Sequence, residues 1–253
     1  MKSLTRKLWR DLWHLRAQAM AIALVISSGV AVLIMSLSTL HSLQTTQQTY
    51  YNHSRFADVF VHLKRAPLSI VAQIESLKGV KTVSPRISAY VNLEVPGFKE
   101  PVLGSLLSLP DVGEPKLNKP YLKQGRGLQP FRDNEVLISE AFAKAHHLHL
   151  NDKIAAVING RYKDLVIVGV ALSPEHIYQI PPGGIFPDYK RYGVMWMSLR
   201  PFATAYDMEG AFNDLILQLQ PGVNPKQVID ELDALLKRYG GLGAYERKDQ
   251  LSH

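Results

Sequence analysis

The apolar positions of the chain form one long uninterrupted stretch followed by shorter periodic segments. Residues 17–54 contain no Asp, Glu, Lys or Arg, and their apolar centre runs from Ala19 to Leu40. At a rise of ~1.5 Å per residue, a helix over this centre reaches ~33 Å, which is enough to cross a hydrocarbon core of ~30 Å. The pattern therefore predicts a transmembrane helix over residues 17–43.

A cleaved signal peptide is the alternative interpretation of this stretch. Signal peptides have an apolar region of about 7–15 residues and end in a small-x-small cleavage site. Here the apolar run is longer, and residues 36–43 at its end contain no Ala-x-Ala site. The sequence favours a retained membrane anchor.

The residues before the apolar stretch are basic and contain two tryptophans. Because cytoplasmic flanks of membrane helices are rich in Lys and Arg, we expect residues 1–16 to form a cytoplasmic amphipathic stem. The tryptophans are four residues apart, so they share one helix face at the lipid boundary. The predicted anchoring and orienting residues are Lys2, Arg6, Lys7, Arg10, Arg16, Trp9 and Trp13.

Small residues recur every four positions inside the predicted span, at Ala19, Ala23, Ser27 and Ala31. Such a face lets a neighbouring helix approach closely, although single spans also show this spacing by chance. If the face is used, the helix packs against other membrane spans that are absent from this chain.

Two distant segments share a strand–helix–strand pattern. The first has a strand at 57–63 and a helix from Pro67 to Gly79, and the second has a strand at 213–219 and a helix from Pro225 to Gly240. Proline suits the first helical position and glycine the C-terminal cap. Short strands follow each helix, so residues 57–95 and 208–247 are expected to form a split, ferredoxin-like βαβ…βαβ sheet.

The intervening residues 96–207 have a pattern of their own. Strands are expected at 135–139, 154–158, 163–170 and 194–199, with a short helix at 140–147 and a hairpin turn at Asn159-Gly160. The fold class is therefore α+β: an N-terminal transmembrane helix, an outer stem at 44–56, and a split extracytoplasmic domain that carries an inserted β-rich subdomain. Residues 248–253 are the expected lead-in to a missing second span.

Charge and composition narrow the function. The net charge of the 253 residues is +7, of which the first 16 residues carry +4 (five cations minus Asp11), leaving +3 for the rest. The basic character is therefore mainly that of a membrane flank, and no nucleic-acid partner is expected. The absence of cysteine from the sequence excludes disulfides and thiol catalysis.

Candidate chemistry is sparse. Three histidines, His146, His147 and His149, lie close together in the sequence. However, the side chains of neighbouring residues point in different directions, and no nearby Asp or Glu completes a set of metal ligands. No Gly-x4-Gly-Lys-Ser/Thr phosphate loop is present in the sequence, so nucleotide hydrolysis must come from another protein. We predict no catalytic residue, no cofactor and no metal site.

An aromatic segment between residues 177 and 196 is the best candidate for a partner or substrate surface. Exposed aromatic loops are common binding surfaces, but the same residues could be the core of their own subdomain. The candidate residues are Tyr178, Phe186, Tyr189, Tyr192 and Trp196.

Three motifs follow one another in the inserted segment: EVLISEAFA at 135–143, LNDKI at 150–154 and VIVGV at 166–170. Together with the basic stem, the first span and the split βαβ pattern, they resemble the first segment of FtsX/MacB-like ABC transporter permeases. Asn151 stands where that family usually has glycine. Residues 173–197 also resemble a subgroup of large permeases.

The resemblance implies a permease subunit that is not an enzyme. Its partners would be the membrane, other permease spans and a separate cytoplasmic ABC ATPase, which drives the outer domain by mechanotransmission. It also implies the cell inner (plasma) membrane, a cytoplasmic N-terminus and a periplasmic or extracellular main domain. Family members continue with further spans, so the chain is expected to be a truncation or fragment. A single-span sensor or adaptor is the alternative, although the roughly 16 inner residues are short for a signalling module.

Overall fold

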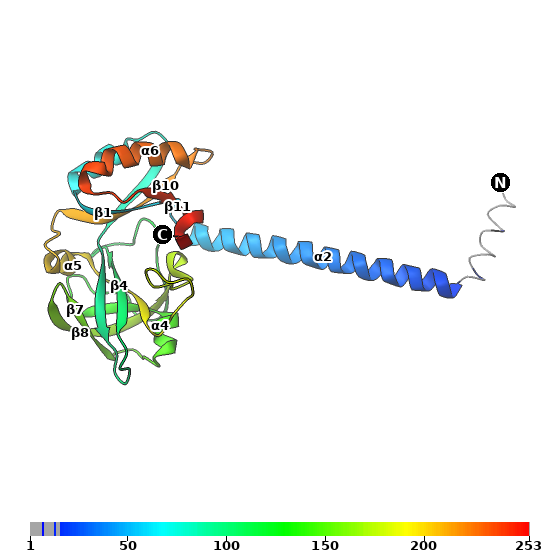
Figure 1. Ribbon diagram of the computed structural model, residues 1–253, viewed down its shortest axis with the longest axis horizontal. Helices are drawn as coiled ribbons and strands as arrows, with labels where there is room; N and C mark the ends of the chain where they lie inside the picture. Colours follow the sequence, from blue (N-terminus) through cyan, green and yellow to red (C-terminus); the bar gives the residue numbers. More distant parts are fainter. Residues whose placement is uncertain (1–6, 8–12, 14–15, 253) are drawn as a thin grey trace. The chain divides into compact units, whose positions relative to one another are not determined.

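The computed structural model describes residues 7, 13 and 16–252, and the chain divides into two compact units, Met1–Tyr50 and Tyr51–His253. Helix α2 (Arg16–His53) begins in the first unit (Figure 1). Its segment Arg16–Leu43, in which an 18-residue window has a mean hydropathy of 2.4, is long and apolar enough to cross a membrane. The predicted apolar helix is therefore present. Most of the predicted stem lies outside the described residues.

The second unit contains a four-stranded antiparallel sheet made from both ends of its sequence. Its strands are β1 (Val59–Pro67), β2 (Val80–Arg86), β10 (Ala211–Leu219) and β11 (Ala244–Glu246), in the order β11-β1-β10-β2. β1 is antiparallel to both β10 and β11, and β10 is antiparallel to β2. Residues far apart in sequence therefore share one sheet.

Two helical segments complete this layer. The first comprises the 3₁₀ turn η1 (Leu68–Ile70) and the short helix α3 (Val71–Glu75), and the second is α6 (Pro225–Leu236), followed by the 3₁₀ turn η3 (Lys237–Tyr239). The side chain of Asn224 caps α6 by accepting a hydrogen bond from the backbone N–H of Lys226. Val228, Leu232 and Leu236 recur every four residues and are buried, as an amphipathic helix requires. In Figure 1, α6 runs along the sheet that contains β1 and β10.

The remaining strands form a seven-stranded sheet in the order β5-β8-β6-β9-β4-β3-β7. A further pairing of β7 with β8 closes six of the strands into a barrel, with β5 added outside β8. The β4–β9 and β6–β8 pairs are parallel, which gives the barrel a mixed topology. The strands are β3 (Ser88–Glu94), β4 (Val102–Leu109), β5 (Tyr121–Gly125), β6 (Glu135–Ser139), β7 (Lys153–Ile158), β8 (Arg161–Leu172) and β9 (Tyr192–Ser198).

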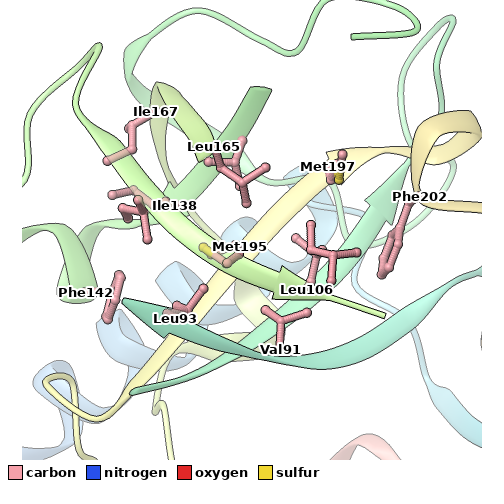
Figure 2. Close-up of a cluster of buried hydrophobic side chains, with 14 of the residues drawn as sticks. Val91, Leu93, Leu106, Ile138, Phe142, Leu165, Ile167, Met195, Met197 and Phe202 are labelled. Atoms are coloured by element: carbon pink, nitrogen blue, oxygen red, sulfur yellow. The ribbon is translucent and has the colours of Figure 1, made fainter. Parts of the chain in front are cut away.

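Apolar side chains fill the inside of this barrel. Figure 2 shows side chains from β3, β4, β6, β8 and β9 pointing toward one another, as expected for a small barrel with a packed interior. Two short helices, α4 (Glu140–Ala145) and α5 (Leu199–Ala205), add the fully buried rings of Phe142 and Phe202 to this core. The remaining 3₁₀ turns are η2 (Pro174–His176) and η4 (Arg247–Ser252).

The change from one sheet to the other differs from the predicted boundary. The expected boundary lies at residues 95 and 96, whereas β3 already pairs with β4 and β7 in the seven-stranded sheet. The chain therefore changes sheet at Ile87. The side chain of Asn213 on β10 secures this point, because it both accepts from the N–H and donates to the carbonyl of Ser88 at 2.8 Å.

Candidate functional site

A buried arginine lies at the end of β2, where the chain changes sheet. Its side chain is 10% exposed and donates from Nε to Asp214 at 2.5 Å. Its two terminal nitrogens donate to the two carboxylate oxygens of Glu175, each at 2.7 Å. Asp214 lies opposite Arg86 in the β10–β2 register, and Glu175 lies in η2, just after β8. One guanidinium thus connects the two sheets.

Two further side chains extend this arrangement. Asn118 donates to Glu175 at 2.7 Å and accepts from the backbone N–H of Ala57 at 2.8 Å. The Nδ1 atom of His62, on β1, lies 2.8 Å from Asp214. We call Arg86, Asp214, Glu175, Asn118 and His62 the Arg86 cluster. It links both sheets and the segment that precedes β1.

The charged side chains of the Arg86 cluster shift one another's pKa values. Burial raises the pKa of Asp214, but the charge of Arg86 and the hydrogen bond from His62 outweigh it, so the pKa lies below its ordinary value. Burial likewise opposes ionisation of Glu175, and the charge and hydrogen bonds of Arg86 again lower its pKa overall. Both carboxyl groups are therefore ionised at neutral pH.

The two histidines beside these carboxylates respond in opposite directions. Burial lowers the pKa of His62, but the hydrogen bond and charge of Asp214 outweigh it, so the pKa is raised. For His176 burial dominates and lowers the pKa despite the neighbouring charge of Glu175. The Nε2 atom of His176 is buried and has no hydrogen-bond partner among the described residues.

A cavity of about 320 Å³ adjoins the cluster, and we call it the tyrosine cavity. Its walls come from both sheets and from the segment after η2. The residues that line it include four tyrosines, two histidines, Glu175 and two serines. They are Tyr90, Tyr178, Tyr192, Tyr245, His62, His176, Glu175, Ser88 and Ser105, together with Leu107 and residues 180–184.

Three tyrosines of this cavity, Tyr90, Tyr192 and Tyr245, stay neutral at neutral pH. Burial raises the pKa values of Tyr90, Tyr192 and Tyr245 above the ordinary tyrosine value. The hydroxyl of Tyr245 lies 3.1 Å from Nε2 of His62, which ties the cavity wall to the Arg86 cluster. The cavity therefore combines neutral hydroxyl groups and aromatic rings with fixed charges beside them, a lining suited to binding.

The predicted aromatic surface divides into exposed and buried parts. Tyr178 and Phe186 are 57% and 74% exposed, and Tyr189 is half-buried. Tyr192 and Trp196 are buried at 6% and 3%, so their placement on an exposed surface is wrong. The reason is that β9 lies between β4 and β6 inside the sheet, where both of its faces are covered. Tyr192 and Tyr178 nevertheless both line the tyrosine cavity.

The predicted membrane residues are only partly described. Lys7, Trp13 and Arg16 are exposed, and the guanidinium of Arg16 lies 5.9 Å from the centre of the Trp13 ring. Ala23, Ser27 and Ala31 are exposed on α2. Lys2, Arg6, Trp9 and Arg10 lie outside the described residues, as does the side chain of Ala19.

The sequence pattern does not single out the Arg86 cluster. In the sequence, nothing distinguishes Arg86, Glu175 and His62 from other polar residues, because their partners lie more than 80 positions away. The two carboxylates that bind Arg86, for example, are 128 and 89 residues from it in the chain. The one available signal is Asp214, the single charged residue of β10, since an unpaired carboxylate among the apolar residues of this strand would be costly.

Comparison with protein families identifies the chain. Residues 19–235 match the model of the MacB-like periplasmic core domain. The chain belongs to this family. The expected relation to FtsX/MacB-like ABC transporter permeases is confirmed. With its apolar helix, the chain is a membrane-anchored protein with an extracytoplasmic, β-rich α+β domain.

Solved structures with a similar chain trace include three bacterial domains. The extracellular domain of the noncanonic ABC-type transporter YknZ from Gram-positive bacteria is 12% identical, with a TM-score of 0.45 over 75% of this chain and 98% of that one. The periplasmic region of MacB from Actinobacillus actinomycetemcomitans is 13% identical, with a TM-score of 0.43 over 75% and 88%. A domain of a putative permease from Porphyromonas gingivalis is 14% identical, with a TM-score of 0.38 over 74% and 85%. No curated protein matches.

Proposed function

We propose that this chain is part of an ABC transporter permease whose outer domain handles a substrate or partner and is driven by a separate ATPase through mechanotransmission. The chain itself would bind and transmit force and would not be an enzyme. The observation that carries this proposal is the family match over residues 19–235, which includes most of the apolar helix, the seven-stranded sheet and three strands of the four-stranded sheet. The anchor and the outer domain thus belong to one family unit.

We further propose that the four-stranded sheet is a split ferredoxin-like unit, formed by residues 57–87 and 208–247, with residues 88–207 inserted. Its strand order β11-β1-β10-β2 and its two helical connections support this assignment. Residues 44–56 would be the outer stem.

The Arg86 cluster gives this proposal a physical route for transmission inside the outer domain. Asp214 and Glu175 lie in different layers and share one buried guanidinium. Separating the two sheets would leave at least one charge buried without its partner, which is costly. We infer that the two sheets move together when the outer domain is driven.

The proposed orientation places the N-terminus in the cytoplasm of a cell with its inner (plasma) membrane, and the main domain outside. Since the sequence contains no cysteine, single-cysteine variants can report this directly. A membrane-impermeant maleimide added to intact cells, after opening of any outer membrane, should label Lys226→Cys but not Ser3→Cys. The reverse labelling pattern would overturn the orientation.

The ATPase partnership is tested by purification of the full chain from its native membrane in a mild detergent. We expect mass spectrometry to identify an ATPase with a phosphate loop, together with further permease spans. Ser27→Leu should reduce their recovery if the small-residue face of α2 packs against those spans. Ser28→Leu adds the same bulk to the next position on another face and is the matched control. Equal recovery from both variants would refute the packing face, and absence of any ATPase would refute the partnership.

A further inference from the structure

The segment between η2 and β9 exposes apolar side chains that the proposed function does not assign. We propose that residues 177–187 of this segment insert their tip into the surface of the lipid bilayer in which the chain is anchored. We call these residues the apolar loop. The inference uses the membrane anchor of the chain and does not depend on an ATPase, on a transported substrate or on the tyrosine cavity.

The first argument is the chemistry of the apolar loop. Residues 177–187 contain no Asp, Glu, Lys, Arg or His, and four of their large apolar or aromatic side chains are strongly exposed. They are Ile177 at 51%, Tyr178 at 57%, Ile185 at 81% and Phe186 at 74%. Exposed apolar residues that are scattered singly are ordinary, but a group of them in one short loop indicates a surface that binds something.

The second argument is that hydrogen bonds of the backbone hold the loop in this shape. At its base, the N–H of Asp188 donates to the carbonyl of Gln179 at 3.1 Å, and Gln179 itself is buried. At its turn, the N–H of Gly184 donates to the carbonyl of Pro181 at 2.8 Å, and Gly183 has a φ of 75°. A second proline followed by a glycine of positive φ is typical of a type II turn. The fold of the loop therefore presents the two apolar side chains that follow this turn.

Two observations favour a bilayer over a protein partner as the surface that the loop contacts. The first is the length of the linker: residues 44–53 of α2 follow the apolar segment, and ten helical residues reach only ~15 Å. The bilayer is therefore a permanent neighbour of the outer domain. The second is charge, because Lys190 lies just beyond the loop and is exposed. An uncharged apolar tip beside a cation is typical of segments that lie in the membrane interface and attract anionic lipid headgroups.

Spin labelling of the full chain in liposomes of phosphatidylcholine and phosphatidylglycerol tests the proposal. Since the sequence contains no cysteine, a nitroxide can be attached at one introduced cysteine at a time. The measured quantity is the ratio of two collision rates of the nitroxide, one with oxygen, which concentrates in hydrocarbon, and one with a polar nickel chelate, which stays in water. We expect this ratio to be at least about threefold higher at Phe186→Cys than at Val112→Cys. Val112 is the matched control, because it is apolar and 77% exposed but lies between β4 and β5, outside the loop.

A second substitution shows whether the apolar chemistry of the tip causes the contact. Ile185→Asp adds a charge that is costly to bring into the bilayer, so the ratio at Phe186→Cys should fall to that of Val112→Cys. Val112→Asp is the matched control and should leave the ratio at Phe186→Cys unchanged. Both replaced side chains are exposed, at 81% and 77%, so neither substitution disturbs a buried contact of the outer domain.

Three results would overturn the proposal. The first is an equal ratio at Phe186→Cys and Val112→Cys, and the second is an unchanged ratio at Phe186→Cys after Ile185→Asp. The third is a low collision rate of the Phe186→Cys label with both reagents, which would show that the loop is buried against a second copy of the chain. Any of them would leave the proposed ATPase partnership untouched, because that partnership is measured by co-purification. Conversely, a lipid-exposed loop in a chain that recovers no ATPase would support the bilayer contact alone.

Discussion

Replacement of Arg86 by methionine should destabilise the outer domain by about 3–5 kcal/mol, the cost typical of breaking a buried ion pair from one side. The structure places this residue at the upper part of that range. Its guanidinium bonds to two carboxylates that are 0% and 6% exposed, and methionine would remove this cation from both. Arg86→Lys keeps the charge but cannot bind both carboxylates with a planar fork, so its loss should be intermediate.

Urea unfolding of the full chain in detergent micelles measures this loss. The sequence has three tryptophans, so a Trp9→Phe, Trp13→Phe background leaves only Trp196, which is 3% exposed, as the fluorescent reporter of the outer domain. For about 200 residues, the expected loss corresponds to a fall in Tm of about 6–20 °C.

The matched control is Arg191→Met. Arg191 also bonds to a carboxylate, that of Glu100, but both side chains are more than half exposed, at 59% and 51%. Exposed pairs contribute about 0–1 kcal/mol, so this variant should change little. If Arg86→Met and Arg191→Met lose the same stability, the burial argument is wrong. Adding Glu175→Gln and Asp214→Asn to Arg86→Met should restore part of the stability, because neither side chain then carries the buried negative charge that Arg86 stabilises. A further loss of stability would refute that explanation.

Two further predictions concern protonation and packing. The pKa of His62 is raised in the folded chain, so the stability that His62 contributes is complete below its ordinary pKa of 6.5 and is lost as the pH rises through its pKa in the folded chain. His62→Asn should therefore flatten the fall in unfolding free energy between about pH 6 and 8. An unchanged dependence of the unfolding free energy on pH, measured by urea titration, would contradict this. His176 has the opposite sign but is present in both proteins, so the comparison cancels it. Gly169→Ala on β8 would place a methyl group 2.6 Å from the carbonyl of Arg126 and should cost about 1–3 kcal/mol, whereas Gly127→Ala, with nothing within 4 Å, should be nearly neutral in the same assay; equal losses would refute the steric argument.

The spacing of apolar residues predicts a helix or strand when the segment's own sequence determines which of its positions are buried. The helix that begins at Pro225 shows its buried positions in its own sequence, and β6, α4, β7 and β8 follow the expected order in the inserted segment. The short run Val102–Leu109 lies between two prolines and contains Gly104, so its pattern alone does not distinguish a strand from a loop. It is nevertheless a central strand, β4, because the preceding strand β3 pairs with one of its edges and the distant strand β9 pairs with the other.

The same reasoning explains why the sequence predicts aromatic chemistry near residue 178 but assigns two residues wrongly. Tyr192 and Trp196 look like the exposed aromatics around them because nothing local indicates that β9 is covered on both faces. Closure of the barrel decides that, and closure depends on β7 pairing with both β3 and β8.

The Arg86 cluster is the feature of the fold that connects the two sheets of the outer domain. Each of its residues is unremarkable in sequence, and its chemistry exists only where the chain changes sheet between β2 and β3. A buried guanidinium with two carboxylates is a weak source of net stability, because desolvation offsets much of the attraction. An apolar cluster of the same shape would hold the sheets together as well. What the charged cluster adds is a fixed geometry between the two layers, because the donors of one guanidinium bind carboxylates from β10 and from η2.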